Sequence, residues 1–270
     1  MSATRTAICL AIAVGLWAPA AQAYPAYRRL FKANYGQAIR CDLCHSGGGG
    51  TERNPYGKAW QAAGERRVSF NKIEAFDSDG DGITNAEELK NGSNPGDKRS
   101  TPQRPGNTWA QQDFIPIPND QLVLVMGAVD TLEASEPDLT PKQLETLTAG
   151  VGRIDEIDKY PTLYFGMVGG KRSAVAVFSE VEVRDGQFST LVGMGTDGRI
   201  KKVALFRSGN DSGSIYTEFL KCFEGKTKSQ LSEENLKDCP SGSASGPAIH
   251  ALSLAVRKAM WTITSLYAKK

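Results

Sequence analysis

Five consecutive residues, Cys41-Asp42-Leu43-Cys44-His45, carry the most specific chemistry in this sequence. A c-type haem needs two closely spaced thiols to bond its vinyl groups and an adjacent imidazole that reaches the iron. A CxxC pair also suits a disulfide or half of a zinc site, but zinc needs two further ligands, and neither Cys nor His recurs before Cys222. The run therefore predicts one haem bonded to Cys41 and Cys44, with His45 as an iron ligand.

A second run, residues 77–88, places oxygen atoms at the spacing of a twelve-residue calcium loop. Gly82 occupies position six, where the loop turns sharply. With the following residues 89–97, the segment resembles thrombospondin type 3 and dockerin-like calcium repeats; the alternative is an acidic, solvated turn. A single loop at extracellular calcium levels favours a structural site between modules over a sensor. The expected calcium ligands are Asp77, Asp79, Asp81, the Ile83 carbonyl, Asn85 and Glu88.

The N-terminus has the pattern of an export signal. Arg5 precedes an apolar run over residues 7–17, and Ala21-Gln22-Ala23 is a small-x-small site suited to signal peptidase. A membrane anchor is the alternative, but the apolar run is shorter than the roughly 20 residues of a bilayer-spanning helix. We expect a signal peptide over residues 1–23, a periplasmic or secreted protein, and no transmembrane segment after cleavage.

Charge and cysteine usage limit the partners and the redox state. The net charge is +2 without any basic run, so neither nucleic acid nor an anionic membrane is an expected partner. Once Cys9 is assigned to the signal, Cys222 and Cys239 are the cysteines that remain outside the CxxC pair. An oxidising compartment favours a disulfide between them, and two free buried thiols are the alternative.

The second axial ligand of the iron has several candidates. The first methionine after Cys44 is Met126, far along the chain, and His250 is the only other histidine. His250 is therefore one candidate. The other possibilities are an open coordination site, and an ordinary exposed N-terminus with Lys58 or Tyr56 near the iron.

Tyr24-Pro25 at the expected start of the mature chain resembles the start of cytochrome f, whose terminal amine coordinates its haem. The resemblance covers only residues 24–45, and its specific parts are the Tyr-Pro start and the CxxCH run. It implies that Tyr24 binds iron through its main-chain nitrogen, with Pro25 fixing its own φ nearby.

Short helices are expected to position the CxxCH run. Residues 24–39 have mixed helical spacing, residues 46–50 form a flexible glycine loop, and Asn54 caps a second helix that begins at Pro55. Residues 91–107 are rich in Gly, Pro, Ser and Asn, which predicts a linker without a core. The expected order is a haem module over 24–75, a calcium loop over 76–97 and a linker over 98–113.

The remainder, residues 114–270, has the pattern of an antiparallel sheet with helices. Thr140 caps a helix that begins at Pro141, with Gln143 completing a capping box. Amphipathic spacing predicts a closing helix over 247–268. Strands are expected over 162–168, 173–181, 187–194 and 199–206, separated by glycine-containing turns. The fold class is therefore α+β.

Residues 162–206, 218–227 and the closing helix resemble the FMN-binding domain of flavin-carrying respiratory proteins, a family that includes subunits of sodium-translocating NADH:quinone reductases. The most telling stretch is the strand-turn-strand of residues 191–200. The resemblance covers about residues 120–268 and implies an FMN-binding-like domain.

The family attaches FMN through a phosphoester to the Thr of an Asp-x-x-Ser-Gly-Ala-Thr motif. Here residues 238–244 read Asp-Cys-Pro-Ser-Gly-Ser-Ala, so the acceptor position is Ala244, or Gly246 in a second register, and neither has a hydroxyl. FMN held without a covalent bond at the helix start, an acceptor shifted to Ser243 or Ser245, and a scaffold without cofactor are the alternatives. The expected phosphate contacts are Ser241, Gly242, Ser243 and Ser245.

These features together predict an extracytoplasmic electron-transfer protein with one covalent haem and one Ca²⁺. Its partners would be redox proteins, a membrane respiratory complex among them. No catalytic residue set is visible, so the sequence leaves open whether the protein is an enzyme. The alternatives are a flavocytochrome reductase that passes electrons between FMN and haem, and a non-redox haem sensor or assembly protein.

Overall fold

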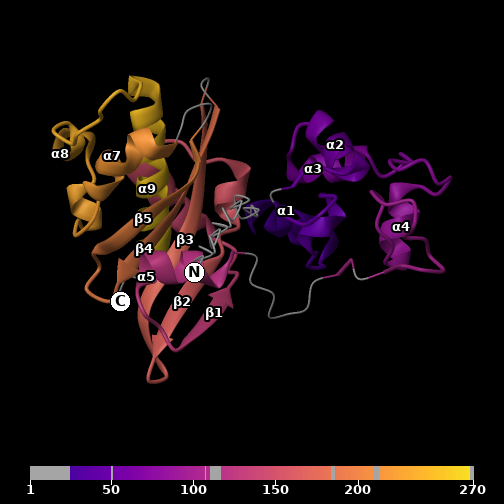
Figure 1. Ribbon diagram of the computed structural model, residues 1–270, viewed down its shortest axis with the longest axis horizontal. Helices are drawn as coiled ribbons and strands as arrows, with labels where there is room; N and C mark the ends of the chain where they lie inside the picture. The colour runs from indigo at the N-terminus through magenta and orange to yellow at the C-terminus, as the bar shows by residue number, and fades with distance from the viewer. Residues whose placement is uncertain are drawn as a thin grey trace, which may run out of the picture.

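The computed structural model describes residues 25–49, 51–106, 108–109, 117–183, 186–208 and 213–267. The expected signal peptide and Tyr24 lie outside these ranges. The described chain combines helices with a five-stranded antiparallel sheet and a long C-terminal helix, which confirms the α+β class (Figure 1).

The N-terminal module consists of short helices around one small core. Its elements are α1 (Pro25–Tyr35), the 3₁₀ turn η1 (Cys41–Leu43), α2 (Pro55–Ala62), α3 (Arg67–Lys72) and α4 (Asn85–Asn91). Aromatic rings fill much of this core: Trp60 stacks on Phe70 with centroids 5.0 Å apart, and Phe31 meets Phe70 edge-on at 5.3 Å. The fully apolar members of the cluster are Leu30, Phe31, Ile39, Leu43, Trp60, Phe70, Ile73 and Leu89.

The segment that was expected to be a linker folds back onto this module. Ser93 is fully buried, Trp109 packs against Phe31, and the Arg40 amide donates to the Thr108 carbonyl at 3.1 Å. The low apolar content of this segment predicted a linker because few of its side chains can contribute to a core. Here small polar residues are placed by hydrogen bonds instead, and one distant tryptophan supplies the apolar contact.

The C-terminal domain contains a sheet in which each strand pairs with the next along the chain. The strands are β1 (Thr131–Ser135), β2 (Leu163–Val168), β3 (Lys171–Val183), β4 (Gly186–Gly195) and β5 (Ile200–Ser208), in the order β1-β2-β3-β4-β5. The four expected strands are all present. Strand β1 was not expected, because none of its side chains is buried and it lacks an apolar pattern; pairing with β2 holds it at the sheet edge.

Helices cover both faces of the sheet. Helix α9 (Gly246–Tyr267) packs on one face over a cluster that includes Phe188, and α6 (Pro141–Val151) packs beside α9. Helix α5 (Asn119–Met126) covers part of the other face. Helix α6 has the predicted capping box, with the Gln143 amide 3.3 Å from Thr140 Oγ1.

Short elements complete the C-terminal domain: η2 (Glu156–Lys159), η3 (Gly213–Tyr216), α7 (Thr217–Lys221), η4 (Lys228–Gln230) and α8 (Glu233–Leu236). The expected disulfide is present and links Cys222 to Cys239, with their Cα atoms 5.9 Å apart. Among the helices in the described ranges, none is long and apolar enough to cross a bilayer.

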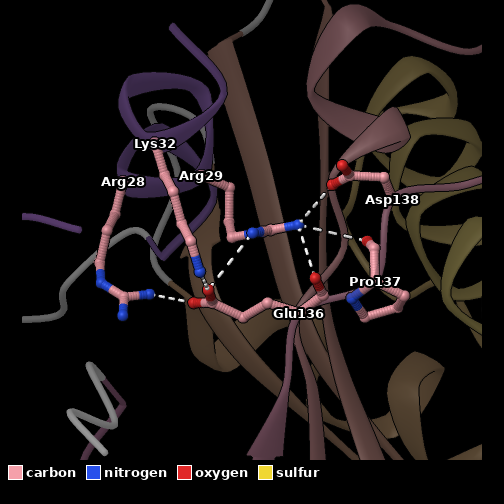
Figure 2. A network of polar contacts seen from close by, with 6 residues as sticks. All are labelled: Arg28, Arg29, Lys32, Glu136, Pro137 and Asp138. Carbon is pink, nitrogen blue, oxygen red and sulfur yellow. Dashed lines mark hydrogen bonds and ion pairs between the residues drawn. The ribbon is translucent and has the colours of Figure 1, made fainter. Parts of the chain in front are cut away.

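An ion-pair network joins the two parts of the chain. Figure 2 shows Arg28, Arg29 and Lys32 of α1 converging on Glu136, which follows β1. Lys32 Nζ lies 2.6 Å from Glu136 Oε2, and Arg29 also reaches Asp138 at 2.9 Å. Burial alone would raise the pKa of Glu136, but the three cations outweigh burial and hold it below its ordinary value.

Candidate functional site

The cysteine turn, residues 41–45, begins with the 3₁₀ turn η1 and packs against the first turn of α2. The Cys44 and His45 amides donate to the Cys41 carbonyl at 3.2 and 3.1 Å. Asn54 caps α2 as predicted, because its Oδ1 accepts from the Gly57 amide at 2.9 Å. Gly57 lies so close to the Cys44 carbonyl that any Cβ at this position would overlap with it. Helix α2 is therefore seated directly against the turn.

His45 has the tautomer that suits iron. Its Nδ1 lies 2.6 Å from the Thr51 carbonyl oxygen, which can only accept a hydrogen bond. The proton is therefore on Nδ1, and the acceptor lone pair is on Nε2. A hydrogen bond from the other ring nitrogen to a backbone carbonyl orients histidine ligands of metals in this way.

Cys41, Cys44 and His45 line one crevice of the N-terminal module, which holds about 50 Å³ of free space. Sequence reasoning did not identify the remaining walls, because they come from positions scattered through the module. Three are cationic and the others are mainly apolar, a combination suited to a macrocycle with acidic substituents. These further lining residues are Tyr27, Arg28, Ile39, Arg40, Gly49, Arg53, Trp60 and Phe70.

Both thiols of the cysteine turn lie in a buried environment that disfavours the thiolate form. Burial raises the pKa of Cys44 to about 12, and burial also raises the pKa of Cys41. A reactive or redox-active cysteine has the opposite environment, because the thiolate is the nucleophile.

The candidates for the second axial ligand lie in different places. Tyr24 falls outside the described residues, immediately before α1, whose Tyr27 lines the crevice. His250 is exposed on α9, with Nδ1 3.7 Å from Glu233 Oε1, and Figure 1 shows α9 within the C-terminal domain, apart from α2, α3 and α4. Lys58 is exposed and paired with Glu52.

The calcium loop brings its acidic residues together as the spacing predicts. Carboxylate oxygens of Asp77, Asp79 and Asp81 lie within 4.8 Å of one another. Asp77 accepts the amides of Gly80, Asp81 and Gly82, and the Gly82 amide contributes most to lowering the pKa of Asp77. Backbone amides of the loop therefore fix the position of the Asp77 carboxylate.

Several loop oxygens are buried without a hydrogen bond. In the described structure, neither carboxylate oxygen of the buried Glu88 accepts one, nor do the Oδ2 atoms of Asp79 and Asp81. Burial, with Asp79 beside it, raises the pKa of Glu88 to about 8; burial and Asp81 raise that of Asp79 to about 6. Converging carboxylates that lack donors fit a hard cation such as Ca²⁺.

The Asn85 side chain makes hydrogen bonds within the protein, although its position in the loop predicts a water-mediated contact with calcium. Its buried amide donates to the Ile73 carbonyl at 2.7 Å and to Ser78 Oγ at 2.9 Å. The side chain therefore ties the loop to the end of α3. The water-mediated contact expected of Asn85 and the contact expected of the Ile83 carbonyl stay predictions.

The serine-rich turn of the C-terminal domain lies at the start of α9. The Ala244 amide donates to the Ser241 carbonyl at 3.0 Å, and Ser245 Oγ accepts from the Ala248 amide at 3.3 Å. Ser243 and Ser245 are exposed, as is Gly242. The Ser245 hydroxyl thus acts as a helix cap, and neither Ala244 nor Gly246 supplies a hydroxyl for a phosphoester.

Comparison with known protein families finds one match. The model of the bacterial TSP3 repeat matches residues 77–98, which supports the calcium-repeat part of the sequence interpretation. Among curated proteins, none matches the chain.

Proposed function

We propose that this protein is an exported electron carrier with one c-type haem on Cys41 and Cys44 and with His45 as axial ligand. The observation that carries the proposal is the arrangement of all three side chains along one crevice, with the Thr51 carbonyl fixing the iron-binding tautomer of His45. A haem bound there would supply one-electron chemistry. The chain itself would hold the iron, orient the imidazole and limit access of water.

The donor set fits this group, and the free space indicates how the crevice must adapt. About 50 Å³ cannot admit a macrocycle, so one wall has to move. Gly49 lines the crevice within the glycine run after His45, and glycine has the widest choice of backbone conformations, so we expect this wall to move.

The second ligand in this proposal is the Tyr24 amine exposed by signal cleavage. Its support is the start of α1 at Pro25 and the presence of Tyr27 in the crevice wall, only three residues further along. His250 is disfavoured because it lies on α9 beside Glu233.

The calcium repeat in this proposal is a structural staple of the haem module, and its ligands include the buried Glu88 carboxylate. The C-terminal domain would serve as a docking scaffold toward a redox partner in the periplasm or outside the cell. FMN held non-covalently at the start of α9 would make the protein a flavocytochrome instead.

The deciding experiment is expression of the full chain with cytochrome c maturation machinery. We expect haem that resists acid-acetone extraction and shows reversible reduction in its absorption spectrum. The double variant Cys41→Ser/Cys44→Ser should lose this haem, whereas Cys222→Ser/Cys239→Ser should keep it.

Extractable haem, or none, would overturn the proposal. Flavin is measured in the same sample after acid precipitation. One flavin per chain would favour the flavocytochrome, and an iron that stays five-coordinate and binds CO would favour the sensor.

A further inference from the structure

The two residues between the cysteines are held by amide side chains through their carbonyl oxygens. Asn54 Nδ2 donates to the Leu43 carbonyl at 2.9 Å and to the Asp42 carbonyl at 3.2 Å. Asn94, from the calcium repeat, donates to the Asp42 carbonyl at 2.9 Å. The cysteine turn is therefore clamped from two elements that are far apart in the sequence.

The orientation of Asn94 is determined by its neighbours. Its Oδ1 accepts from the Gly96 amide at 3.0 Å, so Nδ2 faces the Asp42 carbonyl as a donor. Gly96 in turn packs against the Asn54 side chain, and any Cβ at Gly96 would overlap with the Asn54 amide. The Asn54 and Asn94 side chains therefore both contact Gly96 of the calcium repeat.

A direct route connects this clamp with the calcium loop. Glu88, at position twelve, lies in the first turn of α4, and its carbonyl accepts the Ser93 amide at 2.9 Å and Ser93 Oγ at 3.2 Å. Asn94 follows Ser93 directly. A displacement of α4 is therefore passed on to Asn94 through a buried, hydrogen-bonded segment.

We infer that Asn94 is a positioning residue that couples calcium occupancy of the repeat to the order of the Cys41–His45 turn. The inference rests on the calcium site of the proposed function and extends it to the cysteine turn. Without a cation, the buried oxygens of Asp79, Asp81 and Glu88 lack the ligand that would hold them together, so α4, which carries Glu88, is held less firmly against the loop. Coupling of this kind is reciprocal, so the ordered turn also favours calcium binding.

Other contacts also join the repeat and the segment after it to the module: Trp109 packs against Phe31, and the Arg40 amide donates to the Thr108 carbonyl. A polar cavity of about 340 Å³ lies between the turn and residues 94–108, with Asp42, His45 and Asn94 among its walls. Among the contacts described, the bond from Asn94 to the Asp42 carbonyl is the one that joins the repeat directly to the residues between the cysteines. Loss of one hydrogen bond worth about 1.4 kcal/mol corresponds to a tenfold change in a local opening equilibrium.

The test is hydrogen exchange of the Cys44, His45 and Asn54 amides in the full mature chain, with Ca²⁺ and with a chelator. We expect chelation to speed exchange at these amides about tenfold or more, and to lower the melting temperature. Asn94→Ala should show fast exchange even with Ca²⁺ while calorimetry still detects calcium binding. Asn91→Ala is the matched control, because Asn91 is exposed on α4 and its side chain bonds only the Glu87 carbonyl among the contacts described.

The possible results distinguish a failure of the coupling from a failure of the calcium site. Chelation that lowers the melting temperature but leaves exchange at the turn unchanged overturns the coupling and keeps the calcium site. Chelation without any effect on exchange or melting overturns both. The chelation comparison needs no variant, so it decides even if Asn94→Ala does not fold, and it requires no haem.

Discussion

In the N-terminal module, one small cluster of apolar residues surrounds the cysteine turn, whereas the sheet of the C-terminal domain carries a cluster on each face. The two regions also treat buried charge differently. Lys258, almost completely buried, is paired with Asp158 at 2.7 Å and with Asp155 at 3.1 Å, so the C-terminal domain neutralises its own cation. The Glu88 oxygens of the N-terminal module have no such partner in the described chain.

This difference indicates which region depends on added groups. Buried carboxylate oxygens without a hydrogen-bond partner cost free energy, so the calcium loop gains stability when a cation binds. The C-terminal domain obtains its stability from apolar burial, an internal ion pair and a disulfide. We therefore expect the two regions to respond to different perturbations.

The largest effect should come from the core of the C-terminal domain. Phe188 is fully buried and meets Tyr216 edge-on, so Phe188→Ala should reduce the free energy of unfolding by about 4 kcal/mol in urea titrations. The stabilisation by Ca²⁺ should be retained. Phe76→Ala, at an exposed phenylalanine, is the control and should change stability by less than about 0.5 kcal/mol. A shift of the unfolding transition of the C-terminal core by Ca²⁺ would mean that both regions unfold as one unit.

Removal of the disulfide should have the next largest effect, again in the C-terminal domain alone. Cys222 and Cys239 are 17 residues apart, and a crosslink of this span stabilises by about 3 kcal/mol because it restricts the unfolded chain. Cys222→Ser/Cys239→Ser should therefore lower the denaturation midpoint. Hydrogen exchange at the cysteine turn should not change. An altered turn would contradict the separation of the two regions.

Glu136→Gln tests the junction shown in Figure 2 and should cost about 2 kcal/mol, because the charge-assisted bonds from the three cations of α1 to this carboxylate are lost. Asp138→Asn is the control: Asp138 is exposed, and within the described ranges its ion pair is with Arg29. It should cost much less.

The same junction predicts a pH dependence. The folded pKa of Glu136 is lowered, so its contribution is present above the unfolded pKa and is lost as pH falls through the folded pKa. Acid should therefore weaken the native protein more than Glu136→Gln in unfolding titrations below about pH 4. Equal acid sensitivity would mean that Glu136 is not the group responsible.

The smallest effect is expected at the start of α6. Thr140→Ala removes the cap and should cost about 1 kcal/mol of unfolding free energy. Thr146→Ala, on the exposed face of the same helix, is the matched control and should be close to neutral. If both variants unfold at the same denaturant concentration, the capping box contributes nothing to stability.

Much of the molecule could be predicted because the signals are local. The caps at Asn54 and Thr140, the four longer strands and the acidic loop all depend on residues within a few positions of one another. Helix α5 was missed because it has eight residues with weakly segregated apolar positions, and β1 because none of its side chains is buried.

The sequence by itself determined which groups can do chemistry: two thiols and an imidazole in one short run, and carboxylates at calcium spacing. Only the tertiary structure decided what surrounds them. It placed Tyr27, Arg28 and Trp60 along the crevice, and Asn94 against the Asp42 carbonyl. The physical reason is the separation of the residues along the chain. Motif spacing follows from the geometry of adjacent residues, whereas these contacts join distant residues that only the folded chain brings together.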